Sequence, residues 1–274
     1  MIAPMTRLLP LALTLCCLGA IGCSADPDLR ADDWEENYDR VQKMTASGEH
    51  DQAIAVAKAF LKKYPDNVDG HLMVGAALAN AAKDASDQRR PAWFTEAVPH
   101  YTRALELTKN PMWRFLATIG LIEAYDVKAL NNPAEAARYA RMRITDEPKN
   151  MMAYSTLLGL LEQAKKYDEV LGLLSEAKGS IEASADNYYA YASRVHDLVG
   201  FAPDFPRDKA RTLLPDTVAL IDQSLAKYGR TEQLLRVKGM LLREQAEIEP
   251  DPARQSALQA ASQKTFEELD RLEK

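Results

Sequence analysis

The side chains that most often carry out chemistry are scattered along this 274-residue chain. Its histidines are His50, His71, His100 and His196, and none stands in an H-E-x-x-H pair or beside a cysteine, as zinc ligands do. The sequence has no G-x-S-x-G nucleophile turn and no glycine-rich phosphate loop. Its 40 Asp and Glu residues are expected mainly on solvated helix faces. We therefore expect a non-catalytic protein without cofactor or metal, and the alternative is an active site that leaves no motif.

The one reactive position that the sequence singles out is Cys23. Residues 1–22 contain a single positive charge, Arg7, before an apolar run over 8–22. That run is shorter than the roughly 20 residues that span a bilayer as a helix, and its layout is that of a secretory signal peptide. It ends in Gly-Ala-Ile-Gly-Cys, which resembles the lipobox of bacterial lipoproteins with alanine in place of the usual leucine. The resemblance implies cleavage before Cys23 and a lipid on its thiol.

The residues around Cys23 are consistent with an anchored protein. The two other cysteines lie inside the leader, so the mature chain would keep one thiol and form no internal disulfide. Ser24 follows, whereas Asp at that place commonly favours the inner membrane in two-membrane bacteria, so the resemblance implies the outer membrane and its periplasmic face. Residues 23–33 then form a short acidic tether. The alternative is ordinary cleavage near Ala25, which would leave a soluble periplasmic protein.

Composition indicates a soluble helical protein that does not bind nucleic acid. The chain is 47% hydrophobic and 27% charged, as in ordinary globular proteins. Its formal net charge is −6, and it has no basic run. An acidic chain of this kind lacks the positive surface on which nucleic-acid binding depends.

The elements that carry these residues are predicted to be paired helices. Gly48 can adopt the positive φ that ends a first helix over 34–46, and an apolar stripe then follows at helical spacing until Pro65. The segment 48–67 resembles the second half of a tetratricopeptide repeat (TPR), a unit of 34 residues. Further on, three positions recur at intervals of 34, namely Ala124, Leu158 and Ala192.

The resemblance implies an all-α fold. We expect a TPR-like helical solenoid of about six antiparallel helix pairs over 34–274, with a C-terminal capping helix. Prolines interrupt the pattern: Pro99 should kink its helix or move its start later, and the partner helix of the fifth pair is expected to start at Pro215. Segment 83–92 is expected as an inserted loop, because insertions in such arrays map to loops on one face, and 199–212, with two prolines, is expected as a loop or short helix.

In the TPR family the first helices of the pairs line a surface that binds a peptide or a partner's helix. Positions counted along these helices predict a partner-binding groove, whose aromatic and apolar lining suits protein contact. The alternative for any one of them is packing between repeats. The predicted groove residues are Tyr38, Leu72, Leu121, Tyr125, Met152, Tyr189 and His196. A second candidate surface is the loop with Phe201 and Phe205, which could instead pack back on the helices.

Taken together, the sequence predicts a non-catalytic scaffold or adaptor lipoprotein of the cell envelope with a protein or peptide partner. Lipoproteins of this shape serve β-barrel assembly and pilus assembly or accompany solute transporters. A first repeat that ends in Tyr-Pro is similar to the β-barrel assembly group, although later repeats do not keep its pattern. The alternative is a periplasmic carrier of a small ligand or a solute-transporter partner, which an enclosed apolar cavity would favour.

The lipobox predicts a lipid on the mature N-terminus. Mass spectrometry of that terminus should detect an acylated Cys23, and Cys23→Ser should release the protein from the membrane. A free amine that begins at Ala25 or later would contradict the prediction.

Overall fold

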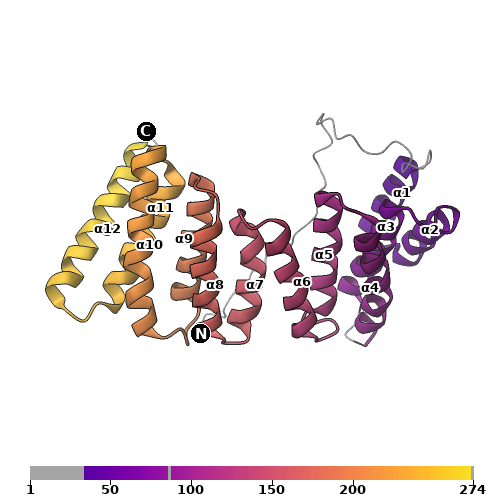
Figure 1. Cartoon of the computed structure of the whole chain (residues 1–274), viewed down its shortest axis with the longest axis horizontal. Helices are drawn as coiled ribbons and strands as arrows, with labels where there is room; N and C mark the ends of the chain where they lie inside the picture. The colour runs from indigo at the N-terminus through magenta and orange to yellow at the C-terminus, as the bar shows by residue number, and fades with distance from the viewer. Residues whose placement is uncertain (1–33, 86–87, 273–274) are drawn as a thin grey trace.

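The protein is all-α over the residues that its computed structural model describes, which are 34–85 and 88–272. The predicted leader, Cys23 and the tether 23–33 lie outside these residues. Helices follow one another in an antiparallel row along the long axis of the molecule (Figure 1). They are α1 Trp34–Ala46, α2 His50–Lys63, α3 Val68–Asp84, α4 Arg90–Leu107, α5 Pro111–Tyr125, α6 Pro133–Asp146, α7 Met151–Gln163, α8 Tyr167–Ser180, α9 Ala185–Phe201, α10 Arg207–Tyr228, α11 Glu232–Ile248 and α12 Pro252–Leu272.

The odd-numbered helices from α3 onward begin at short polar residues that cap their first turn. Each capping side chain accepts a hydrogen bond from a backbone N–H that has no partner inside the helix. The caps of α3, α5, α7, α9 and α11 are Asn67, Asn110, Asn150, Ser184 and Thr231. The helix pairs are therefore delimited by local chemistry that is legible in the sequence.

Two of these starts are built in the same way. His71 lies four residues after its cap, and its Nε2 is 3.0 Å from the carbonyl oxygen of Pro65. Tyr154 lies four residues after its own cap, and its hydroxyl donates to the carbonyl of Pro148 at 3.1 Å. His71 and Tyr154 thus take equivalent places and hold equivalent turns.

Both inserted loops are shorter than predicted, because the neighbouring helices continue into them. The helix α3 ends at Asp84 and α4 begins at Arg90, so most of 83–92 is helical; residues 86–87 lie outside the described part. Likewise α9 continues to Phe201 and α10 starts at Arg207, which leaves 202–206 as the connection. The expectation of long loops at these places was wrong.

Neither Pro99 nor Pro215 marks the start of its helix. Pro99 lies inside α4, so the alternative of a later start for that helix was wrong, and Pro215 lies inside α10, eight residues after the start of that helix. A proline in a helix costs about 3 kcal/mol, because it removes a backbone hydrogen bond and crowds the preceding turn. In α10 the buried Ala210 and Leu214 precede the proline, and burial of this turn offsets the cost.

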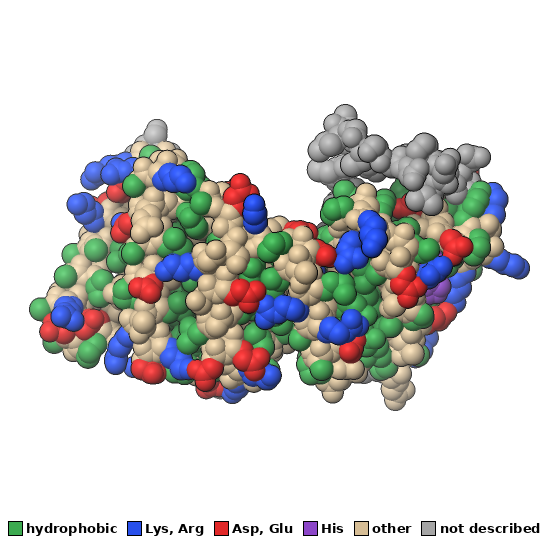
Figure 2. Space-filling model, in the orientation of Figure 1, with side chains coloured by type: hydrophobic (Ala, Val, Ile, Leu, Met, Phe, Trp, Pro, Cys, Tyr) green, Lys and Arg blue, Asp and Glu red, His purple; other side chains and the backbone are tan. Residues whose placement is uncertain are grey.

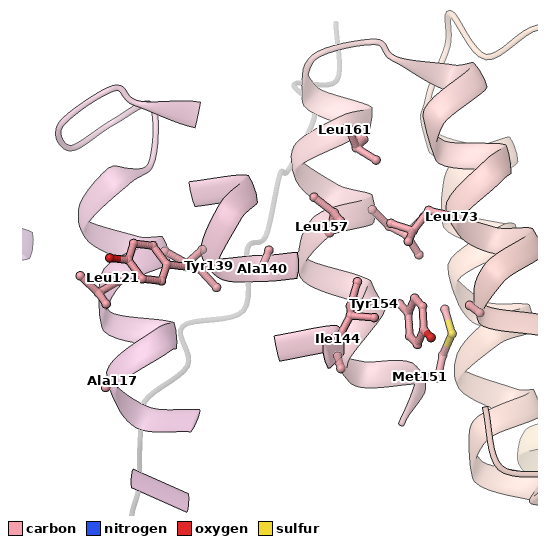
Figure 3. Packing of buried hydrophobic residues seen from close by; sticks show 14 of the residues in the cluster. Ala117, Leu121, Tyr139, Ala140, Ile144, Met151, Tyr154, Leu157, Leu161 and Leu173 are labelled. Atoms are coloured by element: carbon pink, nitrogen blue, oxygen red, sulfur yellow. The ribbon is translucent and has the colours of Figure 1, made fainter. Parts of the chain in front are cut away.

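The helices form two layers with different spacing. Each consecutive pair of odd-numbered helices packs directly together, except α5 and α7, whereas in the described chain even-numbered helices make no comparable contact with one another. We call α1, α3, α5, α7, α9 and α11 the inner layer. At its exception, α6 joins the two halves: Tyr139, Ala140 and Ile144 lie between the apolar faces of α5 and α7 (Figure 3).

Ion pairs link helices that are about one helix pair apart in sequence. Within the inner layer Lys83 pairs with Glu123 at 2.8 Å, and Arg194 pairs with Glu162. The outer layer is bridged by pairs on its surface, such as Arg141 with Glu176 at 2.9 Å. These ion pairs thus join neighbouring helices within each layer.

The last helix covers the end of the row, although its inward face differs from the predicted one. Leu269 is buried as expected, but Leu272 is exposed. Instead the buried Ser262 donates a hydrogen bond to the carbonyl of Gly239 in α11 at 2.8 Å. No helix in the described ranges is both long and apolar enough to cross a membrane.

Close contact between α3, α4 and α5 depends on two glycines. The buried ring of Tyr101, in α4, lies between Gly75 of α3 and Gly120 of α5. A Cβ added at Gly75 would lie 2.8 Å from Tyr101 Cε1, and one added at Gly120 would lie closer still. A ring of this size therefore fits only where both facing residues lack a side chain.

Gly120→Ala should consequently destabilise the protein, while Gly159→Ala should not. Overpacking typically costs about 1–3 kcal/mol, and Tyr101 has neighbours on both sides. Gly159 is the matched control, because it lies within α7 and no atom is near its missing Cβ. Alanine there should stabilise α7 by up to about 1 kcal/mol through helix propensity. Thermal denaturation measures both, and equal shifts would refute this account of Tyr101.

Candidate functional site

The predicted groove residues separate into accessible and buried side chains. Met152, on the first turn of α7, is 61% exposed. Tyr38, Tyr125 and Tyr189 are half-buried on α1, α5 and α9. These four residues belong to the inner layer and retain surface that a partner can contact.

The other three predicted residues pack inside the protein. Leu121 has no exposed surface, and Leu72 is buried as well. His196 is also buried, and its Nδ1 lies 2.5 Å from Glu244 Oε1 on α11. Because these three side chains are buried, we leave Leu72, Leu121 and His196 out of the binding surface.

Two of the three accessible tyrosines stack on other rings. Tyr125 stacks on Tyr139 of α6 with ring planes 7° apart and centroids at 6.0 Å. Tyr38 stacks on Trp34 with centroids at 4.9 Å. Partial burial raises the pKa of both phenols, so these hydroxyls stay neutral and serve as hydrogen-bonding groups.

The junction between α5 and α7, which we call the central seam, contains a buried charge. Arg143 of α6 is 6% exposed, and its guanidinium lies over the ring of Phe115 of α5, 4.3 Å from the centroid. Its nearest carboxylate is Glu147, at 4.0 Å. Burial lowers the pKa of Arg143, while Glu147 and Asp146 act in the opposite direction.

Two exposed methionines occur at the same end of the seam. Met112 and Met152 are each the second residue of their helix, α5 and α7. The start of α5 meets the end of α6 where Arg114 binds Asp146 through two hydrogen bonds of 3.1 Å, and α7 begins just beyond. The molecule is also indented where α6 meets α7 (Figure 2). The central seam thus combines a buried arginine with two exposed methionines at the starts of the flanking helices.

Arg143, Phe115 and Met112 were not among the predicted site residues. A signal for Arg143 is present in the sequence, because it falls on the inward stripe of α6 with Ala136, Ala140 and Ile144. A charge on such a stripe is uncommon unless it is paired. Phe115 and Met112 could have been found only by placing the start of α5 at Pro111.

In the second candidate surface, the two phenylalanines differ in burial. Phe205 is buried and meets Tyr167 edge to face, with centroids 5.3 Å apart. Phe201 is 73% exposed at the end of α9, although its ring also touches His196. One phenylalanine therefore packs back on the helices, and the other remains at the surface.

One titratable pair lies outside the central seam. The Nδ1 atoms of His71 in α3 and His100 in α4 are 3.3 Å apart. Since His71 Nε2 donates to the carbonyl of Pro65, its Nδ1 accepts from His100. Burial is the main cause of the lowered pKa of each ring, with Arg103 adding to it at His71. This hydrogen bond requires a neutral His71, and the lowered pKa of each ring favours the neutral form of both.

Comparisons of the chain with protein-family models and with curated proteins found no match. Across 34–85 and 88–272, no three His, Cys, Asp or Glu side chains are grouped so that they could hold a metal ion.

The histidine pair predicts a loss of stability in acid. Because both pKa values are lowered in the folded protein, the unfolded chain binds protons more readily, and the free energy of unfolding falls as pH drops below the unfolded value of about 6.5. Thermal denaturation from neutral to mildly acidic pH should show this fall. The double variant His71→Gln/His100→Gln should lose less stability over the same range, and an unchanged pH dependence would contradict the assignment.

Proposed function

We propose that this protein is a non-catalytic scaffold that binds a protein partner on its inner layer, centred on the central seam. In this proposal the helix pairs form a TPR-like solenoid whose concave side is the inner layer. The observation that carries it is the exposed apolar surface at the seam, where Met152 and Met112 lie in solvent at the starts of neighbouring inner helices.

Repeated contacts support the solenoid. The equivalent places of His71 and Tyr154, 83 residues apart in the sequence, are what repeated helix pairs would produce. Ion pairs between helices of the same layer recur with similar spacing, as in Lys83–Glu123. Closer spacing in one layer makes a row of helices curve towards that layer, which would turn the inner layer into a trough.

The chemistry of the seam supports a protein as the partner. Methionine, aromatic residues and arginine are enriched in protein interfaces, and the seam offers all three in Met152, Phe115 and Arg143. Methionine adapts its shape to different apolar partners. A small-ligand carrier finds no support in the hollow along α12, which is lined mainly by charged residues such as Arg230, Lys264 and Glu267. A second hollow, between α9 and α10, has more apolar residues in its lining, including Phe205 and Ile248, and it is the place where a small ligand would be sought.

The cellular setting of this proposal comes from the sequence. In this proposal 1–22 is the signal peptide and a lipid on Cys23 holds the protein on the periplasmic face of the outer membrane, which the lipobox-like ending and Ser24 support. The partner would then be an envelope protein, of which components of β-barrel assembly or pilus assembly are the first to test.

Site-specific crosslinking in intact cells tests the binding face. A photoreactive residue placed at Met152 should crosslink one consistent envelope protein. Ser175 is the matched control, because it is exposed on α8, the helix paired with α7, in the outer layer. The Ser175 position should give little or none of this product.

Met152→Ser should then reduce capture of the crosslinked partner without loss of helicity. Removing an interface anchor can cost about 2 kcal/mol or more. Strong crosslinking at Ser175 with none at Met152 would show that the partner binds the outer layer instead.

A further inference from the structure

We propose that Arg143 receives a carboxylate of the bound partner, so that the central seam selects segments in which an Asp or Glu side chain lies beside an apolar residue. This inference rests on the proposed function, because it names the chemistry of the partner at the same site. The inference follows from the apolar neighbours of the guanidinium and from the hydrogen bonds that its N–H groups leave unmade.

The hydrogen-bonding capacity of Arg143 is unfilled. A guanidinium has five N–H donors, yet within the described chain none of those of Arg143 makes a hydrogen bond to a protein group. Glu147 lies 4.0 Å away, beyond hydrogen-bonding distance, and its Oε2 already accepts from Asn150 at 2.8 Å. Burial of most of this side chain carries a desolvation cost that one ion pair at 4.0 Å offsets only in part, and a hydrogen-bonded anion would offset more of it.

Arg114, in the same region, provides a comparison, because its guanidinium is hydrogen-bonded to a carboxylate. It lies one residue from Phe115, and both its Nε and its Nη2 donate to the carboxylate of Asp146 at 3.1 Å. Arg114 is nonetheless more exposed than Arg143. The more deeply buried arginine is therefore the one without a carboxylate at bonding distance.

The neighbours of Arg143 are suited to an acidic segment with an apolar residue. Phe115 covers one face of the guanidinium, and Met112 lies one helical turn before Phe115 on the same side of α5. On the α7 side, Asn150 joins Glu147 to the backbone of Met152. A partner carboxylate can take two parallel hydrogen bonds from Arg143 while its apolar neighbour lies against the methionines.

Paired peptides separate the charge from the apolar contact. The probe is an array of short synthetic peptides, each made with its Asp or Glu residues and as a twin with Asn or Gln. Wild-type protein should prefer the acidic member of each bound pair by about tenfold, which corresponds to about 1.4 kcal/mol and lies near the lower end for a charge-assisted hydrogen bond.

Three variants identify the residue responsible. Arg143→Met removes the charge at similar volume, and should abolish the preference without unfolding the protein. Arg143→Lys keeps the charge without the two-pronged donor and should keep part of the preference. Arg141→Met is the matched control: it lies on the same helix but pairs with Glu176 at the surface, and should leave the preference unchanged.

The outcomes distinguish this inference from the proposed function. Equal binding of the twins to wild type, or a preference that persists in folded Arg143→Met, overturns the carboxylate site. If Met152→Ser then weakens both twins alike, the seam still binds peptide and the proposed function stands. If no peptide binds, the carboxylate site is likewise overturned, and crosslinking at Met152 decides the proposed function separately.

Discussion

The burial of α6 between two neighbours is the interaction on which the middle of this molecule depends. Elsewhere consecutive helices of the inner layer pack directly together, but α5 and α7 do not, so Tyr139, Ala140 and Ile144 of α6 must serve both sides (Figure 3). A single helix pair cannot bury its apolar stripe by itself, and the row gains stability from each interface between neighbours. Because α6 separates α5 from α7, the inner layer opens at this point. The surface that we assign to binding is therefore a consequence of the packing of α6 between α5 and α7.

Glycines allow several other helices to approach one another closely. Gly75 and Gly120 leave the space that the ring of Tyr101 occupies, and Gly200 gives similar access to Glu244, whose partner is His196. At these positions a large side chain fits because the facing residue has no Cβ. At the central seam α5 and α7 do not pack together directly, and the long side chain of Met152 remains in solvent.

Much of this fold was predictable from local chemistry, while the site was predictable only in part. The first helix was placed correctly over 34–46, and Gly48 has the expected positive φ of 75°. The prolines misled the prediction, because the burial of Ala210 and Leu214 outweighs a penalty that is purely local. Periodicity selected both the exposed Met152 and the buried Leu121, because a period gives the face of a helix but not whether another helix covers that face. The role that we assign to Arg143 could not be predicted from the sequence, because it depends on which hydrogen bonds the folded protein leaves unmade.

The central claim is that the partner binds at the central seam. Hydrogen–deuterium exchange of the protein, with and without the partner that crosslinking identifies, tests this claim most directly. Backbone amides exchange more slowly where a partner stabilises the local structure or excludes water. We predict that the partner slows exchange in the first turns of α5 and α7 and along α6, and leaves α8 and α10 unchanged. Slower exchange concentrated in α8 and α10, with α5 to α7 unaffected, would contradict the assignment of the central seam as the binding surface.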